Sequence, residues 1–396
     1  MEMCCILEVD VNGLETFLVD KNIVASFSSR LNRLFGKKSG VVNGELKVIF
    51  HDFPGGSEGF ELMSRFCYNN GKVEINPHNA VLLNRVARFM ELYCNKARSN
   101  QNLEERTENS LKGIDYWPWS ELLISLKQCQ DLFPAKDSSF LVQKIVDCIT
   151  ERLALPAVVS SCASSSDSSC YPCSSMDSVK SNGFHTAWWF EDLMFLEIDW
   201  LDKIVRAMVS KEHDHFATSR FLLYYQKSKS IGATVIEKRR ILEGSINLLS
   251  LVDRDLSTIS CKCLFELLCL GLRWNISIGH KELLESLIGS RFDQATVDHL
   301  LIQSPWGKKY AYDVYLIIRI IKAFLHKGDE LPVGQLKKVG HLIDSYIGEV
   351  AADLHVKPVM FEELVSILPE AVRDSHDSLY RAIDIYVEVP YLDSKF

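Results

Sequence analysis

The chain has 396 residues, of which 47% are hydrophobic and 24% are charged. This globular composition excludes a wholly disordered or collagen-like chain, and the length predicts two or three domains rather than one. The 44 Lys and Arg residues against 52 Asp and Glu give a formal net charge of -8. A nucleic-acid partner is therefore not expected, because binding to phosphates needs an excess of positive charge.

The sequence predicts an intracellular protein. The sequence contains no run of about 18 or more uncharged apolar residues, the length that a transmembrane helix needs. The start, Met1-Glu2-Met3-Cys4, lacks the basic region and the long apolar stretch of a signal peptide. We expect the protein in the cytoplasm or at the periphery of the plasma membrane, and the nucleus is a further possible location. In a reducing compartment the 12 cysteines should be free thiols, buried where they sit in apolar patterns, as do Cys67, Cys129, Cys148 and Cys269.

Residues 1–95 predict a compact domain of a small sheet and several helices. Alternating apolar residues and the turn Asn12-Gly13 indicate a β-hairpin over 5–19. Asp20 is expected to cap one helix that ends at Gly36. The further expected elements are a strand at 45–50, a helix at 60–68, a short strand at 72–75 and a helix from Asn76 to about Tyr93.

Helical segments make up most of the remaining chain. Patterns at 120–129 and 140–153 predict a helical extension of the first domain over 96–156. The Ser- and Cys-rich stretch 157–186 predicts a flexible linker, because it cannot bury enough apolar surface to offset the entropy of ordering. Apolar residues at helical spacing then predict an all-α domain over 187–390, followed by a tail at 391–396.

Signatures of catalysis are not found. The common glycine-rich nucleotide loops and the zinc-protease and hydrolase motifs do not occur, so no catalytic, cofactor-binding or metal-binding residue is predicted. The alternative is a metal-dependent enzyme or sensor in which Cys162, Cys170, Cys173 and His185 bind zinc. Unligated thiols are the favoured interpretation, because only one tightly spaced pair is present. His213-Asp214-His215 is interpreted as a solvated helix end.

Several sequence blocks occur in an order that is typical of one plant family. They are Phe53-Pro54-Gly55-Gly56, Phe60-Glu61-Leu62, Arg65-Phe66-Cys67-Tyr68, Trp188-Trp189-Phe190-Glu191-Asp192-Leu193, residues 288–296, Tyr312-Asp313-Val314 and residues 379–386. With them the chain resembles the non-phototropic-hypocotyl-three family over nearly its whole length. The resemblance implies an α+β BTB/POZ domain followed by a mainly all-α helical domain.

The chain departs from the family pattern at a few positions. Asp20-Lys21 stands where the family usually has a His-Lys pair, and Ile23 stands where a Pro is common. Ala187 replaces an Asp that often precedes the Trp pair. Family members often continue into a polar or coiled-coil tail, so the end at Phe396 suggests a truncated or short form.

The resemblance implies a non-catalytic, substrate-specific adaptor of a cullin-3 RING ubiquitin ligase. The BTB domain would bind cullin-3 and the helical domain would recruit an unknown protein for ubiquitination, in light, phototropic or auxin-linked signalling. The alternative is a ligase-independent scaffold at a membrane-associated receptor complex of the phototropin type. Cullin binding would discriminate between the two hypotheses.

Candidate binding residues follow from the same resemblance. Phe53, Phe60, Glu61 and Arg65 are expected at the cullin-3 surface, and Trp188 and Trp189 in a groove for the target, although such aromatic side chains are more often core. A homodimer or heterodimer through the BTB domain would use Leu31, Leu34 and Phe35. Tyr380 is the candidate phosphosite, and its helical context predicts a half-buried side chain.

Overall fold

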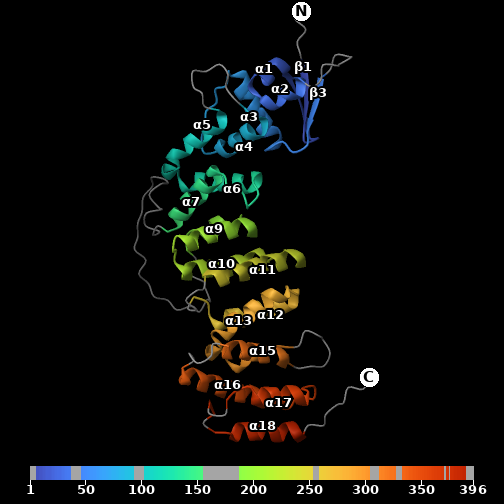
Figure 1. Cartoon of the computed structure of the whole chain (residues 1–396), viewed down its shortest axis with the longest axis vertical. Coiled ribbons are helices and arrows are strands. Elements are labelled where there is room, and N and C mark those ends of the chain that lie inside the picture. Colours follow the sequence, from blue (N-terminus) through green and yellow to red (C-terminus); the bar gives the residue numbers. More distant parts are fainter. Residues whose placement is uncertain are drawn as a thin grey trace, which may run out of the picture. The chain divides into compact units, whose positions relative to one another are not determined.

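The computed structural model describes residues 6–36, 46–92, 102–154, 187–252, 258–303, 312–326, 332–369, 372–373 and 375–388 (Figure 1). The predicted linker at 157–186 and the predicted tail at 391–396 lie outside these ranges. The described residues form two compact units. One unit draws on Met1–Gly183 and Glu191–Lys211, and the other on Phe184–Phe190 and Glu212–Phe396.

The first unit begins with a small sheet and continues with helices. Strand β1 lies in the middle of the sheet, antiparallel to β2 and parallel to β3. The elements of this unit are β1 (Ile6–Val11), β2 (Glu15–Asp20), α1 (Lys21–Phe27), α2 (Ser29–Gly36), β3 (Leu46–Phe50), α3 (Gly56–Tyr68), α4 (Ala80–Met90), α5 (Leu103–Ser110), the 3-10 helix η1 (Leu111–Tyr116), α6 (Trp119–Leu132), α7 (Phe140–Leu153), the 3-10 helix η3 (Glu191–Leu193) and α9 (Ile198–Ser210).

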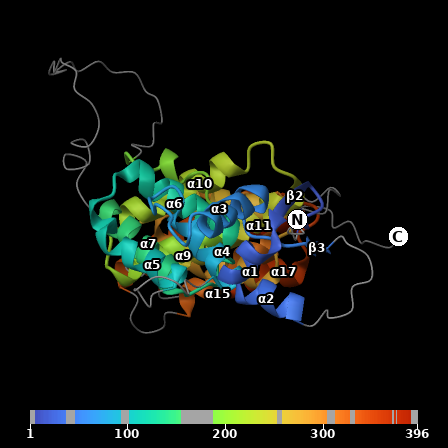
Figure 2. The same ribbon diagram turned by 90° about the horizontal axis from the view of Figure 1, so that it is seen from above.

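The hairpin forms as the sequence predicts. Asn12 and Gly13 both have positive φ, 60° and 69°, which is the backbone that a tight hairpin turn requires. Leu7, Val9 and Val11 of β1 point into the core, where α1, α3 and α4 cover one face of the sheet (Figure 2). The hydrophobic core of the N-terminal residues therefore lies between this face and the helices.

The single helix expected from Asp20 to Gly36 is in fact two helices. Ser28 has an extended backbone (φ −114°, ψ 113°) and ends α1. Its hydroxyl donates to the Met90 carbonyl oxygen at 2.6 Å and accepts from the Leu31 amide at 3.2 Å. The helix is interrupted at Ser28 because its hydroxyl bonds the carbonyl oxygen of Met90, a residue of α4 that is distant in the sequence.

The strand expected at 72–75 is also absent from the structure, which has irregular backbone there. The Arg106 guanidinium of α5 donates to the carbonyl oxygens of Gly71 at 2.9 Å and Val73 at 3.4 Å. A side chain therefore satisfies backbone groups that would otherwise need a neighbouring strand. The expected helix at 76–93 begins later, at Ala80, and Tyr93 lies outside the described residues.

Helix α9 belongs to the first unit, although it falls within the range 187–390 predicted as the all-α domain. Its buried residues include Leu201, Ile204 and Met208, and it packs against α7. The Trp119 indole donates to Asp192 at 2.7 Å, and the Lys203 ammonium donates to the Asp137 carbonyl oxygen at 2.7 Å. These contacts join the residues before and after the predicted linker.

The second unit consists of helices in its described residues. Within it, α10 packs on α11, α12 on α13, α13 on α15 and α16 on α18. Its elements are α10 (His215–Lys229), α11 (Val235–Val252), α12 (Cys261–Trp274), α13 (Ile278–Gly289), the 3-10 helix η4 (Phe292–Gln294), α14 (Val297–Leu300), α15 (Val314–Leu325), α16 (Val333–Val350), α17 (Pro358–Ser366) and α18 (Asp377–Glu388). The expected layout, a small sheet with helices followed by helices alone, is confirmed for the described residues.

Charged side chains connect several helices of the second unit. Glu285 of α13 accepts two hydrogen bonds from the Arg319 guanidinium of α15, at 2.9 and 2.8 Å. Asp344 of α16 accepts from Arg373 at 2.9 Å, and both side chains are less than 10% exposed. The helices α13 and α15 also cross closely, since a Cβ atom at Gly289 would lie 2.9 Å from the Ala323 Cβ. The ion pairs of Glu285 with Arg319 and of Asp344 with Arg373 therefore have a structural role.

Candidate functional site

Helix α3 is positioned by the turn that precedes it. Gly55 has a φ of 69°, and a Cβ at Gly59 would lie 2.0 Å from the Pro54 carbonyl oxygen, so glycine is required at both positions. The Asn12 side chain accepts from the Phe53 amide at 2.7 Å and donates to the Phe53 carbonyl oxygen at 3.2 Å. The hairpin turn thus holds the start of α3, a role of Asn12 that the turn signal alone does not reveal.

The two phenylalanines predicted at the partner surface lie in the core. Phe53 is 3% exposed and Phe60 is 1% exposed, and their rings meet edge to face with centroids 5.6 Å apart. Phe60 also contacts the Phe17 ring at 4.7 Å. A partner could touch the Phe53 and Phe60 rings only if these rings left the core. The two rings therefore support α3, and any contact with a partner must come from the exposed face of this helix.

That exposed face carries Glu61, Arg65 and Tyr68, which recur at helical spacing. Glu61 and Arg65 form an ion pair at 2.6 Å with both side chains more than half exposed. The Tyr68 hydroxyl accepts from the Asp20 amide at 2.7 Å, which ties the end of α3 to the start of α1. The predicted residues Glu61 and Arg65 are therefore accessible on one rigid helix.

The departure at Asp20 and Ile23 preserves the polar anchor of α1. The Asp20 carboxylate accepts from the amides of Asn22 at 2.8 Å and Ile23 at 3.2 Å and so caps the helix. A proline in place of Ile23 would offer no amide hydrogen for the second bond. The Asp and the Ile therefore work together at this helix start.

The predicted dimer residues of the second helical stretch differ in accessibility. Leu31 is fully buried, whereas Leu34 is 40% exposed and Phe35 is half-buried against the core. Leu31 therefore belongs to the domain core, and only Leu34 and Phe35 offer surface to another copy.

Of the predicted tryptophan pair, Trp189 is buried and Trp188 is half-buried. The Trp189 ring lies edge to face with those of Phe190 and Phe221, each at 4.7 Å between centroids. This aromatic cluster packs the start of the second unit. A target groove at this point would have to use the exposed part of Trp188.

Tyr380 lies on α18 and is 63% exposed, so the expectation of a half-buried side chain is wrong. It borders a depression of about 320 Å³ that Arg373, His376 and Leu379 also line. The helix turns its buried residues, Leu379 and Ala382, toward the core and leaves Tyr380 outside this stripe. The hydroxyl is therefore open to modification, and the phosphosite remains a prediction.

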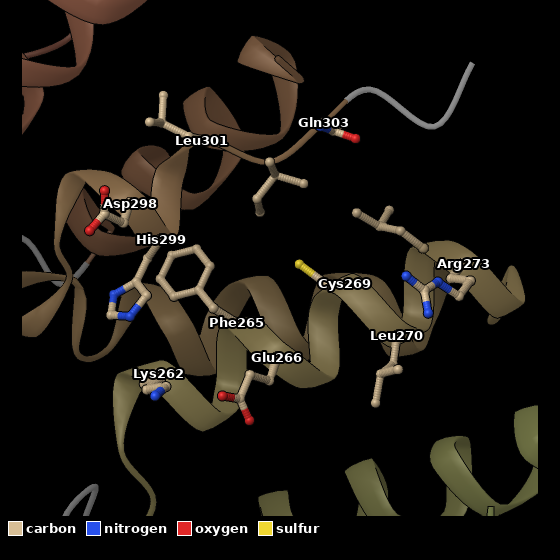
Figure 3. A pocket seen from close by; sticks show the side chains of 12 residues that line it. Lys262, Phe265, Glu266, Cys269, Leu270, Arg273, Asp298, His299, Leu301 and Gln303 are labelled. Carbon is tan, nitrogen blue, oxygen red and sulfur yellow. The ribbon is translucent and has the colours of Figure 1, made fainter. Parts of the chain in front are cut away.

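A larger cavity in the second unit lies between α12 and the chain around α14, and the sequence did not predict it. Its volume is about 880 Å³. Phe265 stacks on the His299 ring, with centroids 5.4 Å apart and planes 14° apart, and Cys269 points into the space beside them (Figure 3). The charged side chains that line it are Lys262, Glu266, Arg273 and Asp298.

Cys269 corrects the expectation of a buried thiol. The side chain is exposed, unlike Cys67, Cys129 and Cys148, which are buried as predicted. Partial burial still raises the pKa of the Cys269 thiol, while the neighbouring Arg273 opposes that shift. Burial raises the pKa of Cys67 to about 12. The apolar pattern of α12 hid the cavity because Cys269 falls beside, not on, the buried stripe that contains Leu264 and Leu268.

The described residues hold no cluster of His, Cys, Asp or Glu that could bind a metal ion. The predicted zinc alternative, Cys162, Cys170, Cys173 and His185, lies outside the described residues. Asp214 caps α10 by accepting from the Phe216 amide at 2.9 Å, and His213 beside it is 9% exposed. The segment follows the end of α9 at Ser210, as expected, and also starts α10, but His213 is buried and not solvated as predicted.

Within the described residues, every helix is too short or too polar to span a lipid bilayer.

Comparison with known proteins gives a consistent result over both units. The model of the NPH3 family matches residues 187–392. The BTB/POZ domain-containing protein At3g22104 of Arabidopsis thaliana is 42% identical over 98% of this chain and 76% of its own length. The Arabidopsis BTB/POZ domain-containing proteins At1g50280 and At3g50840 are 30% and 31% identical, each over 96% of this chain and over 78% and 68% of their own lengths. No solved structure matches.

The family match covers just over half of the chain, and the relatives extend the likeness through the N-terminal sheet and helices. The chain therefore belongs to the plant NPH3 family of BTB/POZ proteins.

Proposed function

We propose that this protein is a non-catalytic adaptor that joins cullin-3 to a protein to be ubiquitinated. The observation that carries the proposal is the family membership, with 42% identity to a BTB/POZ protein over 98% of the chain. Resemblance to this family implies that the N-terminal unit docks cullin-3 and that the helical unit engages the target. Rigid exposed surfaces suit such a role, because an adaptor works by complementary contact and not by chemistry.

For cullin-3 we propose the exposed face of α3. Glu61 and Arg65 are accessible, paired with each other and fixed on a helix whose buried side is held by Phe60 and Met63. A preorganised polar pair can exchange its mutual contact for contacts with a partner at low cost in conformational entropy. Phe53 and Phe60 then contribute to cullin-3 binding indirectly, because their packing in the core positions α3.

For the target we propose the cavity between α12 and α14. It offers apolar surface from Phe265, Leu272 and Leu301 together with charged side chains at its rim. A peptide segment of a partner protein could bury apolar side chains there and pair its charges with Arg273 or Asp298. Self-association through Leu34 and Phe35, as a homodimer or with another BTB protein, would bring two such cavities into one complex.

The test is a calorimetric titration of the full chain with the N-terminal domain of cullin-3. The charge-swapped variant Glu61→Arg/Arg65→Glu keeps an ion pair on α3 but exchanges the positions of its charges. Its matched control is Glu8→Lys/Lys47→Glu, which swaps the exposed pair between β1 and β3, 2.8 Å apart. We expect a Kd of about 10 µM or tighter for the natural chain and the control, and at least about ten-fold weaker binding for the α3 variant.

No binding by the folded natural chain would reject the adaptor function. The ligase-independent scaffold at a phototropin-type or other membrane-associated receptor complex would then be the leading hypothesis. Equal affinities of the α3 variant and the control would leave the adaptor function in place and reject α3 as the cullin-3 surface.

A further inference from the structure

One edge of the second unit exposes several aliphatic side chains at two neighbouring turns. The α10–α11 turn carries Ile231, Val235 and Ile236, and the start of α13 carries Ile278. Ile231 and Ile236 are each 80% exposed, more than any other described isoleucine, and Ile278 is 72% exposed. We call these four residues the isoleucine edge.

The two turns are held together by contacts of α11. The Arg239 guanidinium donates to the Trp274 carbonyl oxygen at 3.0 Å, and the Ser277 amide donates to the Glu243 carboxylate at 2.7 Å. Both turns lie at the same end of the helices that they connect (Figure 1). The exposed aliphatic side chains therefore belong to one surface of a rigid helical pair.

Positive charge surrounds this surface. Residues 227–243 and 273–282 contain seven Lys and Arg against three Glu, in a chain with a net charge of -8. Lys238 lies over the Trp274 ring at 6.0 Å, and the Lys281 ammonium donates to the Asn275 side chain at 3.4 Å. These two cations thus contact neutral groups and keep their charge available to a partner.

Two of the three carboxylates in these segments are turned toward backbone amides, and the third, Glu282, is exposed on α13. Glu237 accepts from the Thr234 amide at 2.8 Å, and Glu243 accepts from the Ser277 amide at the start of α13. Glu243 also lies 3.8 Å from the His280 ring nitrogen. Glu237 and Glu243 therefore serve helix starts, while Lys and Arg dominate the outward charge of the edge.

We propose that the isoleucine edge docks on a membrane that contains acidic lipids. Exposed aliphatic side chains at turn tips can enter the boundary of the acyl chains, and Lys and Arg beside them are attracted to acidic headgroups. A protein partner is less well matched, because neither of the two cavities described above is lined by these four residues. The proposal uses no residue of α3 and does not depend on cullin-3.

The experiment is sedimentation of the full chain with vesicles of phosphatidylcholine alone or with about 30% phosphatidylserine, at about 0.1 M salt. Two variants remove the two components separately: Ile231→Ser/Ile236→Ser and Lys238→Gln/Lys281→Gln. The matched control is Val333→Ser/Val359→Ser, which changes two similarly exposed aliphatic residues elsewhere in the same unit. Circular dichroism checks that each variant is folded.

We expect binding to the acidic vesicles only, weakened by added salt and unchanged in the control. The isoleucine variant should bind at least about ten-fold more weakly, and the lysine variant about five-fold more weakly for each charge removed. Absence of binding by the natural chain would overturn the proposal. So would equal binding by all variants, or binding to an acidic polypeptide such as polyglutamate without any binding to vesicles.

Discussion

In the N-terminal part of the first unit, aromatic rings fasten helices to the sheet, whereas in the second unit charged side chains join helix to helix. Phe60 contacts both Phe17 and Phe53, and the ion pair of Glu61 with Arg65 stays at the surface. Asp344 and Arg373, by contrast, are almost enclosed. The difference shows where charged side chains are available to partners. Exposed charged residues of the first unit, such as Glu61 and Arg65, can be substituted with little loss of stability, whereas several charged residues of the second unit maintain its fold.

The largest effect should come from the aromatic core. Phe60→Ala removes a ring that is 1% exposed and should lower the free energy of unfolding by about 3–5 kcal/mol, since the packed neighbours cannot fill the cavity. Glu61→Ala, one residue along, should change it by less than about 1 kcal/mol. Urea denaturation followed by circular dichroism measures both. Similar losses for the two variants would contradict the contrast between core and surface on α3.

The enclosed ion pair provides the next test. Asp344→Ala leaves the Arg373 guanidinium buried without its carboxylate and should cost about 3 kcal/mol. Lys322→Ala breaks the exposed pair with Glu363 in the same unit and should cost at most about 1 kcal/mol. Thermal and urea denaturation of the two variants would show the difference. If Asp344→Ala proves as mild as Lys322→Ala, charged side chains do not hold the second unit together.

A pair of glycines on α13 tests close helix packing with a smaller expected effect. Gly289→Ala would place a Cβ 2.9 Å from Ala323 and should destabilise the protein by about 1–3 kcal/mol, because α13 and α15 must separate. Gly279→Ala meets open space on the same helix and should stabilise it by up to about 1 kcal/mol. Opposite shifts in the denaturation midpoint are expected. Stabilisation by both substitutions would mean that helix propensity, not packing, decides.

The smallest effect concerns a buried hydroxyl. The Tyr346 ring is fully buried, burial strongly raises the pKa of its hydroxyl, and the oxygen has no hydrogen-bond partner among the described residues. Tyr346→Phe should therefore be neutral or stabilise by up to about 1 kcal/mol. Tyr386→Phe should instead destabilise by about 1 kcal/mol, since the Tyr386 hydroxyl donates to the Val356 carbonyl oxygen at 2.7 Å. Destabilisation by Tyr346→Phe would reveal a partner of that hydroxyl.

Sequence signals predicted the elements that depend on neighbouring residues. The turn at Asn12-Gly13, the cap at Asp20 and the helix from Phe140 to Leu153 all appear as expected, because each is encoded within a few positions. The buried stripe of α3 follows for the same reason. Local turn, capping and periodicity signals are enough to place such elements.

Features that depend on distant residues were missed. The break at Ser28 needs Met90, and the irregular backbone at 72–75 needs Arg106. The cavity beside Cys269 exists only because the chain after α13 returns to face α12, which brings His299 onto Phe265. At the candidate site, the predicted helix at 60–68 begins earlier, at Gly56. The family blocks gave Phe60 and Glu61 alike as partner residues, although Phe60 lies on the apolar stripe and packs inward while Glu61 faces solvent.

The position of α9 limits how the chain can be recombined with its relatives. The family match starts at residue 187, so a chimera between two members would naturally be joined there. Such a hybrid would pair α7 of one parent with α9 of the other, and the contacts of Trp119 with Asp192 and of Lys203 with Asp137 would face unmatched surfaces. A junction after Lys211 keeps α9 with the helices it packs against but takes Trp189 and Phe190 from another parent than Phe221, so the chain threads between the two units and either junction divides packed residues.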